Sequence, residues 1–134
     1  MKRTSVRLLM AALILAPVTL AVLPAAQAAS ILTPESQFAA QGGPALYGSI
    51  CAGCHMPGAQ GAVGAGHYPA LAGNPHVASA GYVVHNVLHG YHGMPGFGGE
   101  LSDQQVADVV NYVRTHFGNA YADAVSPDMV AKAR

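Results

Sequence analysis

The strongest helical pattern in the chain covers residues 103–117. Ser102 is a natural N-cap, and Gln105 completes the capping-box pattern that marks the start of a helix. Gly118 is a typical residue to end it. Apolar residues then recur at the three- and four-residue spacing of a single helix face, namely Val106, Val109, Val110, Val113 and Phe117.

A second amphipathic segment precedes this one. The apolar residues between Tyr82 and Leu88 fall at helical spacing. We therefore predict a helix from about residue 79 or 81 to His89. Five glycines and a proline in residues 90–100 predict a loop between the two helices.

The rest of the chain predicts shorter elements. A helix is expected to begin near Pro44, which is tolerated in a first turn, and to run through residues 45–54. Glycine-rich residues 58–66 predict irregular backbone, and Ser126-Pro127 predicts the start of a last short helix. Because no segment alternates convincingly between apolar and polar residues, the predicted fold class is all-α, with three to five short helices.

The first 28 residues have the order of a secretory signal peptide. Basic residues precede an apolar run from Leu8 to Leu23, and Ala26-Gln27-Ala28 follows it. The run is interrupted by Pro17 and is shorter than the ~20 apolar residues of a spanning helix. Cleavage after Ala28, export to a bacterial periplasm and no stable membrane insertion afterwards are therefore expected.

Four segments follow from these patterns. Residues 1–28 are the cleaved signal peptide, and residues 29–40 form a flexible N-terminal segment without periodicity. One small domain covers residues 41–118, and residues 119–134 form a C-terminal tail with the short helix.

The charge of the part expected to be exported argues against nucleic acids as partners. Of the six basic residues only Arg114, Lys132 and Arg134 follow the signal peptide, against six acidic residues. A mildly acidic surface repels phosphate backbones, so no nucleic-acid partner is expected.

Candidate chemistry lies in a single short motif. Cys51 and Cys54 are the two cysteines of the chain, and His55 follows directly. In an oxidising compartment two such thiols would form a disulfide unless other chemistry consumed them. Three uses have a mechanism: a redox-active dithiol, half of a zinc site, and covalent attachment of haem.

Haem attachment explains the motif best. A dithiol of the thioredoxin type needs a preceding strand, which is not predicted, and the histidine spacings match no common zinc finger. Cysteines three apart lie on one side of a helix, where both thiols can add to the vinyl groups of one porphyrin. His55 is then the expected ligand of the iron, and the expected cofactor is one haem c.

Met94 is the candidate for the sixth ligand of the iron. Pro95 biases it towards an extended backbone, and the surrounding glycines let the chain approach a flat cofactor closely. Met56 adjoins the proximal histidine on the wrong side of the ring, and Met129 lies in a polar tail. Histidines that could replace Met94, or form a surface zinc or copper site, are His85, His89 and His92.

The motif, the export signal and the Met-Pro pair resemble those of class I c-type cytochromes, in particular the small bacterial periplasmic ones. The resemblance covers about residues 42–118 and implies the cytochrome c fold, with helices wrapped around one covalently bound haem. It assigns thioether links to Cys51 and Cys54, and axial ligation to His55 and Met94.

The resemblance also implies roles for residues outside the motif. Gly43 and Tyr47 are expected to cross the C-terminal helix where Tyr112 meets them. The carbonyl of Pro69 is expected to accept a hydrogen bond from the imidazole of His55. Candidate apolar walls of the haem site are Leu71, Tyr82, Val87, Leu88 and Phe97.

The expected function is one-electron transfer rather than catalysis, because histidine and methionine together leave no vacant position on the iron. Expected partners are redox proteins: a periplasmic dehydrogenase, a quinol-oxidising complex or a terminal oxidase. One alternative is a haem enzyme or gas sensor with a labile sixth ligand. Another is a cytochrome subunit bound to a dehydrogenase.

Overall fold

The structure, a computed structural model, describes residues 38–134. The predicted signal peptide and residues 29–37 of the predicted N-terminal segment lie outside the described residues. Within the described part, no helix has the length and apolar character needed to cross a membrane. The elements in chain order are α1 (Gly43–Leu46), the π-helical turn η2 (Tyr47–Cys51), α2 (Ala52–His55), β1 (Ala62–Val63), β2 (His67–Tyr68), the 3₁₀ turn η3 (Pro75–Ala78), α3 (Ala80–His89), α4 (Asp103–Thr115) and α5 (Pro127–Ala131).

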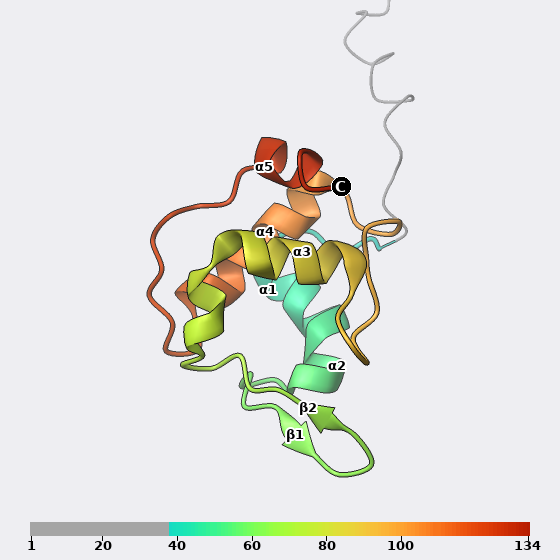
Figure 1. Ribbon diagram of the computed structural model, residues 1–134, viewed down its shortest axis with the longest axis vertical. Coiled ribbons are helices and arrows are strands. Elements are labelled where there is room, and N and C mark those ends of the chain that lie inside the picture. Colours follow the sequence, from blue (N-terminus) through green and yellow to red (C-terminus); the bar gives the residue numbers. More distant parts are fainter. Residues whose placement is uncertain (1–37) are drawn as a thin grey trace, which may run out of the picture. The chain divides into compact units, whose positions relative to one another are not determined.

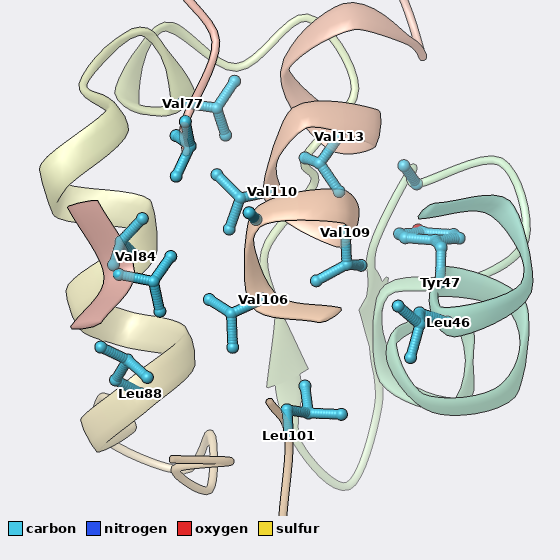
Figure 2. Packing of buried hydrophobic residues seen from close by; sticks show 14 residues of the cluster. Leu46, Tyr47, Val77, Val84, Leu88, Leu101, Val106, Val109, Val110 and Val113 are labelled. Atoms are coloured by element: carbon cyan, nitrogen blue, oxygen red, sulfur yellow. The ribbon is translucent and has the colours of Figure 1, made fainter. Parts of the chain in front are cut away.

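Helix α4 is the centre of the packing, since α1, α3 and α5 all contact it (Figure 1). Figure 2 shows the valines of α4 between Val84 and Leu88 of α3 on one side and Leu46 and Tyr47 on the other. The predicted valine stripe is therefore confirmed as the core, and its buried members are Val106, Val109, Val110 and Val113.

The crossing of α1 and α4 depends on a glycine. A Cβ atom at Gly43 would collide with the Cβ of Tyr112 and the backbone oxygen of Asp108. The rings of Tyr47 and Tyr112 lie 5.8 Å apart, centroid to centroid. The expected meeting of Gly43, Tyr47 and Tyr112 is confirmed.

Helix α4 begins as predicted but ends earlier. The capping box is formed, with both the Ser102 and the Gln105 side chains bonded to the backbone of the other residue. The helix stops at Thr115 rather than at residue 117, because His116 is extended and Phe117 has a φ of 58°. Phe117 thus leaves the helix and packs against Tyr47, with ring centroids 4.8 Å apart.

The first predicted helix is divided by a π-helical turn. The N–H of Ala52 bonds to the oxygen of Tyr47, five residues back, and regular helix resumes over α2. Helix α3 agrees with the prediction, and Ser79 caps it by accepting a bond from the Tyr82 N–H. Helix α5 begins at Pro127, with Ser126 as its cap.

The all-α prediction missed a small sheet. Ala62 pairs with Tyr68 and Val63 with His67 in an antiparallel hairpin that begins inside residues 58–66, which were predicted to be irregular, and ends just beyond them. Two-residue strands are too short to show alternation, and the exposed Val63 gives them no buried face. The described fold is therefore helical with one two-stranded sheet.

The C-terminal segment packs onto the domain. Arg114 of α4 is 0% exposed and donates hydrogen bonds to the carbonyl oxygens of Val77 and Ala78 and to Asp123. Val125 and Val130 are buried in the same core as α4. Residues 119–134, predicted as a tail, thus cover part of the core.

Candidate functional site

The two cysteines lie on consecutive turns of the first helical segment. Cys51 ends η2 and is half-buried, while Cys54 lies on α2 and is exposed. Both are free thiols. Burial raises the pKa of the Cys51 thiol to about 11. Cys51 therefore lies in a poorly solvated environment where a neutral sulfur is favoured.

His55 is oriented by a single hydrogen bond. Its side chain is buried, and its Nδ1 lies 2.9 Å from the carbonyl oxygen of Pro69. Because a carbonyl only accepts, Nδ1 is the donor of this bond, and in the neutral imidazole Nε2 is then the nitrogen with the lone pair. The bond expected between Pro69 and His55 is confirmed, and it leaves Nε2 as the nitrogen for a metal.

The loop that carries Pro69 folds back over α2. The carbonyl oxygen of Ala59 accepts bonds from the N–H groups of Leu71 and Ala72, at 2.8 and 2.9 Å. The Tyr47 hydroxyl donates to the backbone oxygen of Met56 at 2.8 Å, which ties the start of this loop to η2. Burial raises the pKa of Tyr47 to about 12, so the hydroxyl keeps its proton and remains a donor.

Ala59 is a residue that the sequence pattern did not single out. It is completely buried and has a φ of 60°, which alanine rarely adopts. Its carbonyl oxygen holds the loop at Leu71 and Ala72. Nothing in the local sequence of this glycine-rich stretch predicts that contact, because it joins residues from different parts of the chain.

Met94 lies in a closed turn after α3. It is half-buried, and its backbone exchanges two hydrogen bonds with Tyr91, at 2.9 and 3.0 Å. The loop, yellow to orange beyond α3 in Figure 1, is bonded to α3 through the N–H of Phe97 to Val87 and of Gly98 to Leu88. Ligation of iron by Met94 together with His55 stays a prediction.

The candidate walls of the haem site differ in how far the protein buries them. Leu88 is buried within the protein core, whereas Leu71, Val87 and Phe97 are only partly buried and Tyr82 is exposed. Val83 is also partly buried on α3, although its neighbour Val84 is in the core. Helix α3 therefore has an apolar strip that the protein covers incompletely.

These features fit a haem. The donor set combines two free thiols on neighbouring turns, an imidazole with Nε2 available and a thioether in an ordered loop. The partly covered apolar residues Val83, Val87 and Phe97 match the requirement of the ring for apolar contact.

The alternative histidines have other contacts. The rings of His85 and His89 share a helix face, with centroids 4.6 Å apart. Nε2 of His89 lies 3.0 Å from the oxygen of Ala133, and the ring of His92 packs on Tyr91. Within residues 38–134, no three or more His, Cys, Asp or Glu side chains gather as a metal-binding group. The structure thus brings no third ligand to the His85–His89 pair.

Comparison with known proteins gives a family and several relatives. The family model described as "Cytochrome C oxidase, cbb3-type, subunit III" matches residues 38–113. The fructose dehydrogenase cytochrome subunit of Gluconobacter japonicus is 38% identical over 112 residues, covering 69% of this chain and 22% of the relative. The gluconate 2-dehydrogenase cytochrome c subunit of Pantoea cypripedii is 38% identical over 106 residues, covering 70% of this chain and 24% of the relative.

A third relative is also named as the cytochrome subunit of a dehydrogenase. The cytochrome c subunit of alcohol dehydrogenase (quinone) of Gluconacetobacter polyoxogenes is 37% identical over 101 residues, covering 66% of this chain and 21% of the relative. The chain therefore spans less than a quarter of the length of these curated relatives.

Proposed function

The chain belongs to the c-type cytochrome family described as subunit III of cbb3-type cytochrome c oxidase, and we propose that it carries single electrons on one covalently bound haem. The sequence holds one pair of cysteines, which supports a single haem. Thioether links would form at Cys51 and Cys54, and the axial ligands would be Nε2 of His55 and the thioether of Met94.

The observation that carries this proposal is the bond from His55 Nδ1 to the Pro69 carbonyl oxygen, 2.9 Å long. It fixes the tautomer and the orientation of a buried imidazole, which is how metal-binding histidines are held in proteins. The same imidazole directly follows the pair of cysteines, so the held nitrogen and the two thiols belong to one short segment. The bound haem would supply reversible one-electron chemistry of its iron.

Two contacts among the described residues support the role of a carrier, because they would limit movement of the ligands. Pro69 holds the imidazole, and the two bonds between Tyr91 and Met94 hold the thioether loop closed. Ligands that stay in place when the iron changes charge favour rapid electron transfer. The closed Met94 turn favours this function over an enzyme or sensor, which needs a sixth ligand that leaves.

The relatives suggest the electron donor. Their names describe cytochrome subunits of fructose, gluconate and alcohol dehydrogenases. We therefore propose that this chain, exported to the bacterial periplasm as its sequence predicts, accepts electrons from a dehydrogenase and passes them to a downstream redox protein. The dehydrogenase would perform the catalysis, and this chain would act only as the carrier.

Covalent loading is tested first, on protein exported from a host that matures c-type cytochromes. Intact mass should exceed that of the polypeptide by one haem, and Cys54→Ser should lose one of the two thioether links. A mass equal to the bare polypeptide would refute the proposal.

Axial ligation is tested with two methionine variants. Met94→Ala should convert the ferric low-spin spectrum to high-spin and lower the midpoint potential, because a thioether ligand favours the ferrous iron. Met129→Ala is the matched control, since Met129 lies exposed on α5. An unchanged spectrum and potential in Met94→Ala would exclude Met94 as the ligand.

A further inference from the structure

We propose that Asn119 is a positioning residue for the iron ligand His55, acting through the backbone segment that carries Pro69. The inference rests on the proposed function, because it assigns Asn119 a role in setting the reduction potential of the bound haem. Asn119 is not part of the cysteine motif, the methionine loop or the crossing of α1 and α4.

Asn119 joins the end of α4 to the backbone segment that carries Pro69. Its side chain is 6% exposed, and Nδ2 donates to the carbonyl oxygens of Val113 and Leu71, both at 2.9 Å. Val113 lies in the last turns of α4, and Leu71 is two residues beyond Pro69. One amide group therefore attaches the Pro69 segment to the central helix.

The orientation of this amide is unambiguous. Its Oδ1 is buried and has no hydrogen-bond partner within residues 38–134. Rotating the amide by half a turn would place Oδ1 against two carbonyl oxygens and lose both bonds. An unpaired buried acceptor is unfavourable, so the two donated bonds are what this side chain contributes.

The Pro69 segment is held from two sides. On the α2 side, Leu71 and Ala72 donate to Ala59, as described above. On the α4 side, the N–H of Gly73 donates to the oxygen of Phe117 at 3.0 Å, and Asn119 supplies the remaining attachment. Without Asn119, the hydrogen bonds within residues 38–134 that join residues 69–73 to the end of α4 are reduced to the Gly73 bond.

A looser segment weakens the bond that orients His55. Hydrogen bonding of Nδ1–H to a carbonyl makes the imidazole a stronger donor to the metal. Stronger donation stabilises the ferric state, so loss of the Asn119 bonds should raise the reduction potential. The same loss should expose the Nδ1 proton to exchange with water.

Asn111 provides a matched control. It lies on α4, donates from Nδ2 to the Val125 oxygen at 2.9 Å and accepts from the Val125 N–H at 2.8 Å. It thus makes two partly buried bonds between its side-chain amide and the backbone of the C-terminal segment, but none to residues 69–73. Asn111→Ala reports the general cost of removing such an amide.

The experiment compares the haem-loaded wild type, Asn119→Ala and Asn111→Ala. We expect exchange of the His55 Nδ1 proton, followed by NMR, to be at least tenfold faster in Asn119→Ala only. We also expect the equilibrium constant for reduction of the haem to rise at least threefold in that variant. At 59 mV per decade, this raises the midpoint potential by about 28 mV. Both variants should unfold at lower temperature than the wild type.

Each outcome has a defined meaning. Unchanged exchange and potential in Asn119→Ala, or equal changes in Asn111→Ala, would overturn the inference. If Asn119→Ala does not load haem, Asn119→Ser, which keeps a short hydroxyl donor, must show the same directions of change. A wild type without covalent haem would overturn the proposed function as well, whereas a loaded wild type with an unresponsive Asn119→Ala would overturn this inference alone.

Discussion

Replacing the buried Arg114 by methionine should destabilise the domain substantially while leaving the haem motif intact. The guanidinium donates to the Val77 and Ala78 oxygens at 3.0 Å each, to the Asp123 backbone oxygen, and to Asp123 Oδ1 at 2.7 Å. Methionine keeps most of the aliphatic stem and removes every donor. The acceptors that depend on Arg114 then lose their partner together.

The magnitude follows from the burial of these acceptors. The Val77 bond is buried, and an unpaired buried acceptor costs about 1–3 kcal/mol. The other two carbonyl bonds are partly buried and contribute about 0.5–1.5 kcal/mol each. The Asp123 carboxylate is 74% exposed, so its ion pair adds little.

One term opposes this loss. Removing a buried cation recovers its desolvation cost, and no buried charge is left behind because Asp123 is exposed. We therefore expect a net loss of about 2 kcal/mol in the free energy of unfolding, near the lower end of the summed bonds. For a domain of this size that lowers the thermal midpoint by at least about 8 °C.

The assay is urea and thermal unfolding of the haem-loaded protein, with Arg134→Met as the control. Arg134 also donates to two carbonyl oxygens, of Gly98 and Leu101, and pairs with Asp103, but it lies near the surface. Its loss should cost less than about 1 kcal/mol. A loss below that value in Arg114→Met, or a larger loss in Arg134→Met, would refute the reasoning.

Two further predictions concern the helix crossing and the response to acid. Gly43→Ala forces a Cβ into Tyr112 and the Asp108 backbone, so urea unfolding should show a loss of about 1–3 kcal/mol, whereas Gly48→Ala, where space is open, should lose much less. The hydrogen bond from Arg114 lowers the pKa of Asp123, so its contribution is present above about pH 4 and is lost as the pH falls through the lowered value. In Asp123→Asn, the free energy of unfolding should depend less on pH in this range. The same acid response in the wild type and in Asp123→Asn would contradict the assignment to Asp123.

The sequence predicted the elements that have a local cause. Helix α4 combines a capping box at Ser102 with a valine stripe, and both act within the segment itself. The resemblance to c-type cytochromes supplied two long-range contacts, those of Gly43 with Tyr112 and of His55 with Pro69. Neither contact follows from periodicity, because each joins residues on different elements.

The features that the sequence did not predict are strands too short to show a pattern and contacts between residues far apart in the chain. The hairpin of residues 62–68 has strands too short for a pattern. The early end of α4 depends on Phe117 leaving the helix to pack on Tyr47, a tertiary contact. Asn119 and Leu71 are 48 residues apart in sequence, so the local sequence of neither segment predicts their hydrogen bond.

The two expected iron ligands are supported by different parts of the fold. His55 depends on Pro69, whose segment is attached to the end of α4 through Asn119. Met94 depends on α3, to which its loop is bonded by Phe97 and Gly98. Because α3 and α4 share one valine core, the position of each ligand relative to the other is set by that packing. Under the proposed function, the stability of the α3–α4 contact would therefore be a condition for electron transfer with little rearrangement, although neither helix carries His55 or Met94.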